Sequence, residues 1–387
     1  PQESHRIQVL LYQALLRYMF LLESDATDTF LLYSKYPKGL LRSELTSSDL
    51  YRAITLRNEI VWYEEQYRRG GFRILLQLTP DAFHRSENES KLWTDYRAPK
   101  LQHWLDSFQT ASSLEQHYFL RLARSVAEEQ WCAKLGSGAT HTGFASKWLT
   151  TALERMASGN MLSHLSLRLE ADGDGRYAVL ELQTGGGGFT SNSNFRVGDI
   201  VVVYSCAQGQ VPDIRDGIVF KGRIQAIDAH SVRVALTHPQ MSRLAWERPT
   251  DTFWVLESDI NESSYTSQYQ GLYLFLQSSV ARRELILGTR HPATASAAQS
   301  LRGEYGELDH LVVRARQAKE LFLILGPPGT GKTSHVLMSL LREELLDPAG
   351  CILLTAFTNR ALDEICSKLC AAEIDFIHLG TQHSCAP

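Results

Sequence analysis

The pattern of apolar and polar positions begins with helical segments. Residues 6–22 have the apolar content of a buried helix, and residues 29–34 form a short apolar run closed by the turn at Pro37–Gly39. An apolar run of this length beside turn residues predicts a β-strand. Residues 47–69 predict a long helix with charges of both signs. Residues 80–97 are polar and punctuated by prolines, so we expect a connecting loop there.

The middle of the chain changes from helical to β-type patterning. Helical spacing continues from about 99 to 165, and residues 165–257 then form six short apolar runs separated by turn residues: SLRLEA, RYAVLEL, DIVVVYS, IVFKGRIQAI, SVRVAL and TFWVLE. Short strands at this spacing predict a small β-barrel. Helical patterning returns at 264–283. We therefore expect a helical stalk with the barrel inserted at its end.

The last part of the chain has the order of a parallel sheet with crossover helices. Residues 307–319 predict a helix, and the apolar strand LFLIL follows at 321–325. A helix at 332–346, a second strand CILLTAF at 351–357 and a helix at 359–372 continue the pattern. Strand, helix and strand in this order predict an α/β fold, here half of a doubly wound parallel sheet.

A glycine-rich loop stands between the first strand and its helix. Residues Gly326 to Thr333 read GPPGTGKT and match the pattern GxxxxGK[ST]. Glycines let backbone N–H groups approach a phosphate, and the positive end of the following helix adds to the attraction. Lys332 would reach the β- and γ-phosphates, and the Thr333 hydroxyl would bind Mg²⁺. Because a strand precedes the loop and a helix follows it, we interpret it as an ATP·Mg²⁺ site rather than a chance turn.

The residues expected to contact the nucleotide follow from this pattern. Lys332 and Thr333 are the candidate catalytic residues, and Thr333 is the candidate Mg²⁺ ligand. The complete set of candidate nucleotide-binding residues is Gly326, Pro327, Pro328, Gly329, Thr330, Gly331, Lys332, Thr333 and Ser334.

Two polar residues, Thr358 and Asn359, stand where the second predicted strand ends and the next helix begins. This is the carboxyl edge of the predicted sheet, where ligands bind in α/β folds. We therefore expect both residues to contact the backbone of a nucleic acid without reading its bases. The alternative is that their short side chains cap the helix.

Charge and composition limit how the protein could bind nucleic acid. The net charge is −4 and the pI is near 6.4, so any nucleic-acid surface must be a local patch. Candidate cations on the predicted barrel are Arg196, Lys221, Arg223 and Arg233, with ordinary solvated charge as the alternative. No apolar run reaches the roughly 18 residues of a membrane span, and the first residues do not resemble a signal peptide. We therefore expect a cytoplasmic protein.

The phosphate loop and the segment after it resemble motifs I and Ia of superfamily 1 helicases. GPPGTGKTS followed by TAFTNRALDEI is most similar to the 5′-to-3′ branch, which includes the RNA-surveillance helicases and the replication helicase/nucleases. In that family the second segment usually reads APSNxAVD and touches the single strand, and Phe357 replaces the proline here. The predicted barrel, with NFRVGDIVVVY at 194–204, resembles the 1B domain of this group.

The resemblance implies an organisation and an activity. It implies a RecA-like ATPase domain at 301–387 that ends after motif Ia, a barrel at 165–257, and stalk segments at 98–164 and 258–300. It also implies an ATP-dependent helicase that uses ATP and Mg²⁺ and binds single-stranded nucleic acid. DNA is favoured over RNA as the nucleic acid, although the sequence does not distinguish the two. The family's adenine-reading glutamine is absent from residues 301–316, so adenine selectivity is not predicted.

The first predicted helix contains Gln8 and Tyr12 at QxxxY spacing. This spacing resembles the last motif of RecB-like PD-(D/E)XK nucleases, where a Gln and a Tyr lie beside the cleaved strand. The resemblance implies that residues 1–97 are the end of a nuclease-like domain and a connector. The alternative is an ordinary amphipathic helix with Tyr12 in its core.

The rest of the expected machinery would lie outside this sequence. The metal-binding carboxylates of the nuclease would precede Pro1, and the remaining ATPase motifs would follow Pro387. We therefore expect a fragment that binds nucleotide weakly and barely hydrolyses it. Two other functions remain open, an AAA+ remodeller and an inactive nucleic-acid-binding module. The segment AFTNRALDEI and the barrel favour the helicase over the remodeller.

Overall fold

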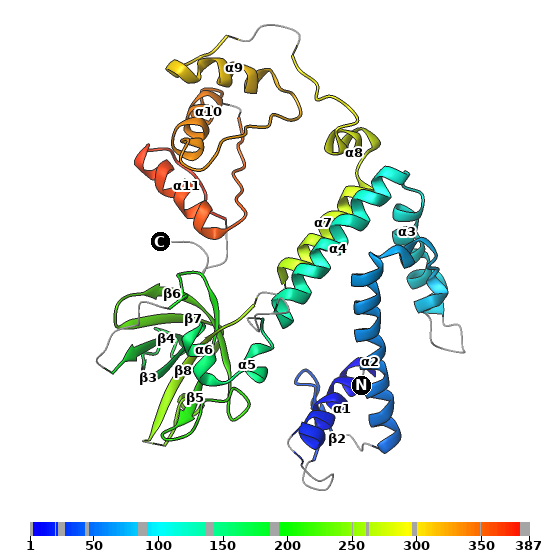
Figure 1. Ribbon diagram of the computed structural model, residues 1–387, viewed down its shortest axis with the longest axis vertical. Helices are drawn as coiled ribbons and strands as arrows, with labels where there is room; N and C mark the ends of the chain where they lie inside the picture. Colours follow the sequence, from blue (N-terminus) through cyan, green and yellow to red (C-terminus); the bar gives the residue numbers. More distant parts are fainter. Residues whose placement is uncertain are drawn as a thin grey trace. The chain divides into compact units, whose positions relative to one another are not determined.

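The structure is a computed structural model, and the residues that it describes are 3–19, 21, 28–42, 46–83, 91–136, 143–185, 193–249, 251–260, 263–295, 300–348 and 350–379. Its internal contacts divide the chain into two compact units (Figure 1). The first unit comprises Pro1–Glu128 and Tyr269–Gln277, and the second comprises Glu129–Gln268 and Ser278–Pro387.

The first unit begins with a helix pair and a small hairpin. α1 (Glu3–Met19) contacts α2 (Ser47–Gly70), and the two helices bury Leu10 and Ala53. The strand expected at 29–34 is β1 (Phe30–Leu32), which pairs antiparallel with β2 (Leu40–Arg42). A capping box formed by Thr46 and Asp49 begins α2, and Gly71 ends it in the left-handed conformation, φ 62°.

The prediction of a loop at 80–97 is wrong, because much of the described part of this segment is helical. A 3₁₀ turn, η3, spans Pro80–Phe83, and a helix is present from residue 91. This helix passes through the π-type turn η4 (Trp93–Arg97) into α3 (Ala98–Gln109). Pro99 lies in the first turn of α3, where a missing backbone N–H is tolerated. The polar composition therefore indicated exposure rather than the absence of a helix.

Aromatic contacts join the helices of the first unit. α4 (Ser113–Leu135) and α7 (Ser263–Gln277) lie side by side, as Figure 1 shows. The ring of Tyr118 on α4 lies 4.8 Å from the ring of Phe275 on α7. Trp104 of α3 approaches Tyr273 of α7 at 5.6 Å between ring centroids. Ring pairs at these distances contribute both buried area and favourable edge electrostatics.

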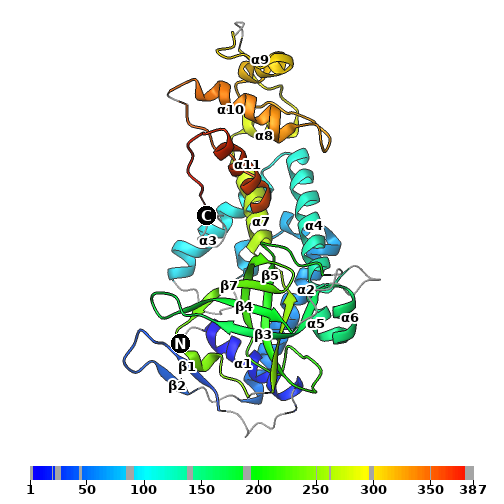
Figure 2. The same ribbon diagram turned by 90° about the vertical axis from the view of Figure 1, so that its left-hand side faces the viewer.

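A closed six-stranded antiparallel barrel lies in the second unit (Figure 2). Neighbouring strands follow the order β3-β4-β7-β6-β5-β8, and β8 closes on β3. The prediction of a barrel is confirmed, because each of the six apolar runs forms one strand. The strands are β3 (Met161–Leu169), β4 (Tyr177–Thr184), β5 (Ile200–Ala207), β6 (Phe220–Ile227), β7 (Ser231–Gln240) and β8 (Thr252–Ser258).

Alternating apolar residues fill the barrel. The interior cluster contains Leu180, Leu182, Val201, Val203, Val232, Val234 and Leu256, all fully buried. Closure requires a glycine on β6, because a Cβ at Gly222 would lie 2.5 Å from Cγ1 of Val234 on β7. Trp246 stacks on Phe220 with ring centroids 4.1 Å apart. The alternation of inward and outward positions along each strand thus fills the barrel interior with apolar side chains.

Buried charges connect the segment that enters the barrel to the strand that leaves it. Arg155 of α6 (Ala152–Ala157) lies 3.3 Å from Glu257 of β8, and the Tyr204 hydroxyl donates a hydrogen bond to the same carboxylate. Lys147 of α5 (Ser146–Leu149) pairs with Asp259 at 3.0 Å. Burial raises the pKa of Glu257 and lowers that of Lys147. Each charge therefore depends on its partner, since an unpaired buried ion is strongly disfavoured.

Four α-helices follow the barrel and α7 in the described part of the second unit. They are α8 (Val280–Leu287), α9 (Asp309–Gln317), α10 (Leu337–Leu345), which comes after the π-type turn η7 (Lys332–Val336), and α11 (Asn359–Ala371). Met338 and Leu341 of α10 form a buried cluster with Ile365 and Leu369 of α11. No helix in the described part of the chain combines the length and hydropathy needed to cross a membrane.

The parallel sheet expected beside these helices is not observed. Residues 321–325 and 351–357 form no strand pairing in the described part of the chain. Several of their apolar side chains are exposed, and Leu325 and Phe357 reach 100% and 99% exposure, whereas Phe322, Ile324 and Leu354 are partly buried. A strand is stable only when a neighbour satisfies its backbone groups, so an apolar sequence alone does not form one. The RecA-like sheet therefore stays a prediction.

We expect Arg155→Ala to destabilise the barrel by about 3 kcal/mol at pH 7, because it leaves Glu257 buried without its guanidinium partner. The loss should be smaller at pH 5. Burial raises the pKa of Glu257, so the folded variant takes up a proton more readily than the unfolded chain and gains stability as pH falls. Urea unfolding at both pH values measures this. The exposed Arg168→Ala is the control, and an equal loss in both variants would contradict the prediction.

Candidate nucleotide and nucleic-acid sites

The phosphate loop owes its shape to two glycines in the left-handed region. Gly329 has φ 83° and Gly331 has φ 77°, and η7 begins directly after Gly331. A Cβ at Gly331 would lie 2.6 Å from the ring of His335, so a larger residue would meet both backbone strain and a clash. The motif glycines are thus required by the local geometry.

Lys332 turns back over its own loop. Its ammonium group donates hydrogen bonds to the carbonyl oxygens of Gly326 and Pro327, the latter at 2.9 Å. The Thr330 hydroxyl also donates to Pro327, at 2.8 Å. A Cβ at Gly326 would come within 2.7 Å of Cγ of Lys332, so this glycine provides the space for the lysine stem. The positive charge is therefore held over the loop by neutral acceptors.

A cavity of about 590 Å³ adjoins the loop. This volume is suited to a nucleotide, because small-molecule sites commonly span about 300–1,000 Å³. It is lined by residues 327–335 and by Glu364 and Lys368 of α11. Lys368 donates to Glu364 at 2.8 Å. Sequence reasoning missed both residues, because a Glu and a Lys one helical turn apart indicate a surface ion pair.

A buried carboxylate anchors the helix that follows the loop. Glu343 of α10 is fully buried and accepts hydrogen bonds from Arg302 N–H at 3.0 Å, Gly303 N–H at 3.1 Å, the Tyr305 hydroxyl at 2.9 Å and Arg316 at 2.6 Å. Burial raises the pKa of Glu343, but these donors lower it more, so it lies below its ordinary value. The glutamine-free segment 301–316 is thereby fixed to the loop helix.

A second carboxylate precedes the loop by a few residues. Glu320 forms a bidentate ion pair with Arg290, with two N–O distances of 2.9 Å. It also accepts the Ala293 N–H at 2.8 Å. The Arg290 hydrogen bonds, followed by that of Ala293, lower the pKa of Glu320 to about 2. This pair ties residues 290–293 to the segment that leads into the phosphate loop.

Thr358 caps α11 in the structure. Its hydroxyl accepts a hydrogen bond from the Ala361 N–H at 3.2 Å, as the alternative interpretation of this residue expected. The residue is nevertheless exposed, so the cap does not remove it from solvent. The side chain of Asn359 lies outside the described part of the structure. The nucleic-acid role of both residues stays a prediction.

The candidate cations of the barrel differ in their partners. Lys221 pairs with Asp259 at 2.7 Å and donates to the Ile260 carbonyl at 3.1 Å. Arg223 donates to the Gly198 carbonyl at 2.8 Å. Both side chains thus already have acceptors within the barrel, and a phosphate would have to compete with them. Their role in nucleic-acid binding stays a prediction.

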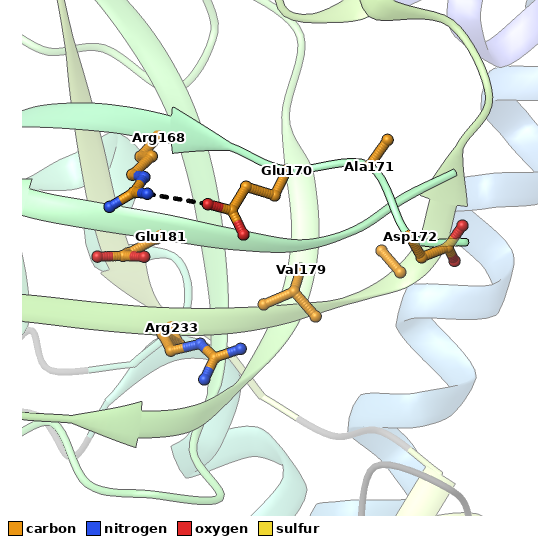
Figure 3. Close-up of a pocket in the computed structure, with 8 residues that line it drawn as sticks. Arg168, Glu170, Ala171, Asp172, Val179, Glu181 and Arg233 are labelled. Carbon is orange, nitrogen blue, oxygen red and sulfur yellow. Dashed lines mark hydrogen bonds and ion pairs between the residues drawn. The ribbon is translucent and has the colours of Figure 1, made fainter. Parts of the chain in front are cut away.

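Two other candidates, Arg196 and Arg233, are exposed on the barrel. Figure 3 shows Arg233 beside a pocket of about 210 Å³, with Glu181 on the neighbouring strand. On β3, the other neighbour of β4, Arg168 is in register with Glu181 and forms an ion pair with Glu170 at 3.0 Å. This face therefore carries mixed charge, so the arginines do not form a uniformly basic patch.

The candidate nuclease residues lie on the surface of α1. Gln8 donates a hydrogen bond to the Tyr12 hydroxyl at 2.9 Å, and Tyr12 is 56% exposed. Tyr12 is therefore not buried, which contradicts its expected place in the core of an ordinary amphipathic helix, and the nuclease role of the two residues stays a prediction. The QxxxY spacing puts both side chains on one accessible helix face, because residues four apart are neighbours on a helix.

Comparisons with known proteins extend these observations. A family described as "AAA domain" matches residues 308–385, which include the phosphate loop, α10 and α11. The DNA replication ATP-dependent helicase/nuclease DNA2 of Mus musculus is 27% identical over 297 residues, covering 70% of this chain and 26% of that protein. The chain is similar to the superfamily 1 replication helicase/nucleases. The resemblance drawn from motifs I and Ia is thus confirmed.

Other replication helicase/nucleases match shorter parts of the chain. The helicase/nuclease JHS1 of Arabidopsis thaliana is 27% identical over 181 residues, 42% of this chain and 13% of that protein. The helicase/nuclease dna2 of Schizosaccharomyces pombe is 42% identical over 74 residues, 19% of this chain and 5% of that protein. The chain therefore spans about a quarter or less of the length of the relatives that it matches.

We expect the Glu320 carboxyl to titrate near pH 2, because Arg290 and the Ala293 N–H stabilise its charged form. Arg290→Ala should raise this pKa toward the ordinary value of 4.5. Since the pKa is lowered in the folded state, the stability from this pair is present above pH 4.5 and is lost as pH falls toward 2. Carboxyl NMR titration measures the pKa, with Arg302→Ala as the control. A wild-type value near 4.5 would disprove the ion pair.

Proposed function

We propose that the protein is an ATP-dependent helicase or translocase that acts on DNA and binds ATP·Mg²⁺ at the phosphate loop. The observation that carries the proposal is the loop from Gly326 to Thr333, with its two left-handed glycines and its lysine beside a nucleotide-sized cavity. The similarity to ATP-dependent helicase/nucleases supports the same conclusion.

The loop can bind polyphosphate by exchanging one set of hydrogen bonds for a stronger one. The Lys332 ammonium group now donates to two neutral carbonyl oxygens. Phosphate oxygens carry full negative charge, and charge-assisted hydrogen bonds are about twice as strong as neutral ones. Lys332 would therefore leave the loop carbonyls and contact the phosphates. The Thr333 hydroxyl would bind Mg²⁺, which supplies further charge neutralisation when present.

The nucleic acid would lie at the first turn of α11 and against the barrel. Thr358 is exposed there, and Asn359 is the first residue of the helix. Contacts at this place would bind the sugar-phosphate backbone and would be insensitive to base sequence. On the barrel, Arg196 and Arg233 are exposed candidate cations, and Lys221 and Arg223 would first have to leave their acceptors within the barrel. We favour single-stranded DNA because the relatives are named as DNA replication proteins.

A nuclease linked to the helicase is the second proposed function. The exposed, hydrogen-bonded pair Gln8–Tyr12 favours it, because both side chains could lie beside a nucleic-acid strand. The competing possibilities are an AAA+ remodeller and an inactive nucleic-acid-binding module. ATP hydrolysis that requires single-stranded DNA would favour the helicase over both.

We expect Lys332→Ala to weaken ATP·Mg²⁺ binding to the chain by about 10- to 100-fold, the range set by one charge-assisted hydrogen bond. The melting temperature should not change, because the Lys332 side chain is exposed and packs into no core. Titration with a fluorescent ATP analogue measures the affinity. Lys319→Ala, an exposed lysine outside the cavity, is the matched control. Unchanged affinity in Lys332→Ala would refute the proposed phosphate site.

We expect replacement of both Thr358 and Asn359 by Ala to weaken single-stranded DNA binding equally for different sequences. Since Thr358 also caps α11, the double variant should lose about 1 kcal/mol of stability as well. Thr358→Ser retains a capping hydroxyl and separates the two effects. Fluorescence anisotropy with oligonucleotides of different sequence measures the affinity. If stability falls and affinity stays constant, the pair is only a helix cap.

A further inference from the structure

α11 places two opposite charges on the wall of the nucleotide cavity. Lys368 and Glu364 line the same cavity as the phosphate loop, although they lie on a different helix. Their ion pair is 2.8 Å long, and the two residues are one helical turn apart. An arrangement of this kind puts a second ammonium group beside the space that a polyphosphate would occupy.

The position of α11 is fixed by its packing on the loop helix. Ile365 and Leu369 are buried against Met338 and Leu341 of α10, and α10 continues directly from the phosphate loop. Lys368 immediately precedes Leu369, so the backbone of the lysine is held by the same contact. The lysine can therefore reach the cavity by rotating its flexible side chain while the helix stays in place.

The charge of the cavity wall favours movement of the lysine toward a bound anion. The cavity is lined by two lysines, Lys332 and Lys368, and by one carboxylate, Glu364. A nucleoside triphosphate brings several negative charges, which attract both ammonium groups and repel the carboxylate. Glu364 has a 64% exposed side chain, so water can solvate it after the lysine leaves. An exposed ion pair contributes little stability, and its loss costs little.

We propose that Lys368 is a second phosphate-binding lysine of the nucleotide site. In the structure it pairs with Glu364, and when a nucleoside triphosphate binds it exchanges this carboxylate for a phosphate oxygen. The inference rests on the proposed nucleotide-binding function and adds a residue outside the phosphate loop. Lys368 then contributes to affinity for the polyphosphate chain and not to recognition of the base.

The first test compares lysine variants of the chain by ATP·Mg²⁺ titration. Lys368→Ala should weaken binding about tenfold, because one charge-assisted contact is lost. Lys368→Arg should stay within about threefold of the wild type, since it retains the charge and the reach. Lys319→Ala should behave as the wild type. If Lys368→Ala binds as tightly as Lys319→Ala, the inference is wrong.

A base-free probe separates a phosphate contact from a general effect on cavity shape. Tripolyphosphate is used as a competitor. The Lys368→Ala change should reduce the affinity for tripolyphosphate by the same factor as it reduces the affinity for ATP. If only ATP binding weakens, Lys368 contacts another part of the nucleotide and the phosphate role is disproved. Equal melting temperatures of the wild type and Lys368→Ala are required for this comparison.

Glu364→Gln tests the exchange itself. Removing the carboxylate frees the lysine and removes a repulsive charge, so ATP affinity should equal or exceed that of the wild type. If Glu364→Gln weakens binding as much as Lys368→Ala, the ion pair acts as a structural contact and the proposed exchange is overturned. If the wild type binds no nucleotide, or if Lys332→Ala binds normally, the proposed function itself fails. These outcomes differ from a failure confined to Lys368.

Discussion

Buried carboxylates hold together segments that lie far apart in the sequence. At the barrel, Glu257 accepts a hydrogen bond from the Tyr204 hydroxyl and forms an ion pair with Arg155. On the helix after the phosphate loop, Glu343 accepts hydrogen bonds from four donors. A carboxylate in a low-dielectric interior is tolerated only when donors surround it. Loss of a single donor would therefore leave the buried carboxylate short of a hydrogen bond, so the position of Arg316 is restricted by its bond to Glu343. This restriction positions the elements that carry the candidate sites.

The same electrostatic rule has a different outcome at the phosphate loop, where the charges are exposed. Lys332 rests on two carbonyl oxygens and Lys368 on an exposed carboxylate, so neither ammonium group is committed to a buried partner. Solvent screening makes such contacts weak and exchangeable. The buried network around Glu343 fixes the helix, while the exposed Lys332 and the partly exposed Lys368 remain able to change partners. A ligand site requires both properties, a rigid support and exchangeable contacts.

The sequence predicted elements whose pattern is local and missed those that depend on distant partners. The six barrel strands were predictable because alternating apolar residues and turn residues are read within one segment. The burial of Glu257 and Glu343 was not predicted. Burial of a glutamate depends on hydrogen-bond donors elsewhere in the chain, and a local sequence pattern does not identify those donors. The apolar runs at 321–325 and 351–357 have strand composition, but a sheet also needs pairing that composition does not supply. Motif spacing located the phosphate loop, whereas only the fold brought Lys368 to its cavity.

α11 presents residues of both proposed sites. It begins after the cap residue Thr358, and its body contributes Lys368 to the nucleotide cavity. Ile365 and Leu369 pack against α10, so Lys368 can exchange its partner by rotation of its side chain while the helix backbone keeps its place. Coupling between two ligands requires that each bind one position of a shared element more tightly than another. A side-chain exchange that leaves α11 in place does not meet this requirement, so the two proposed contacts would contribute independently.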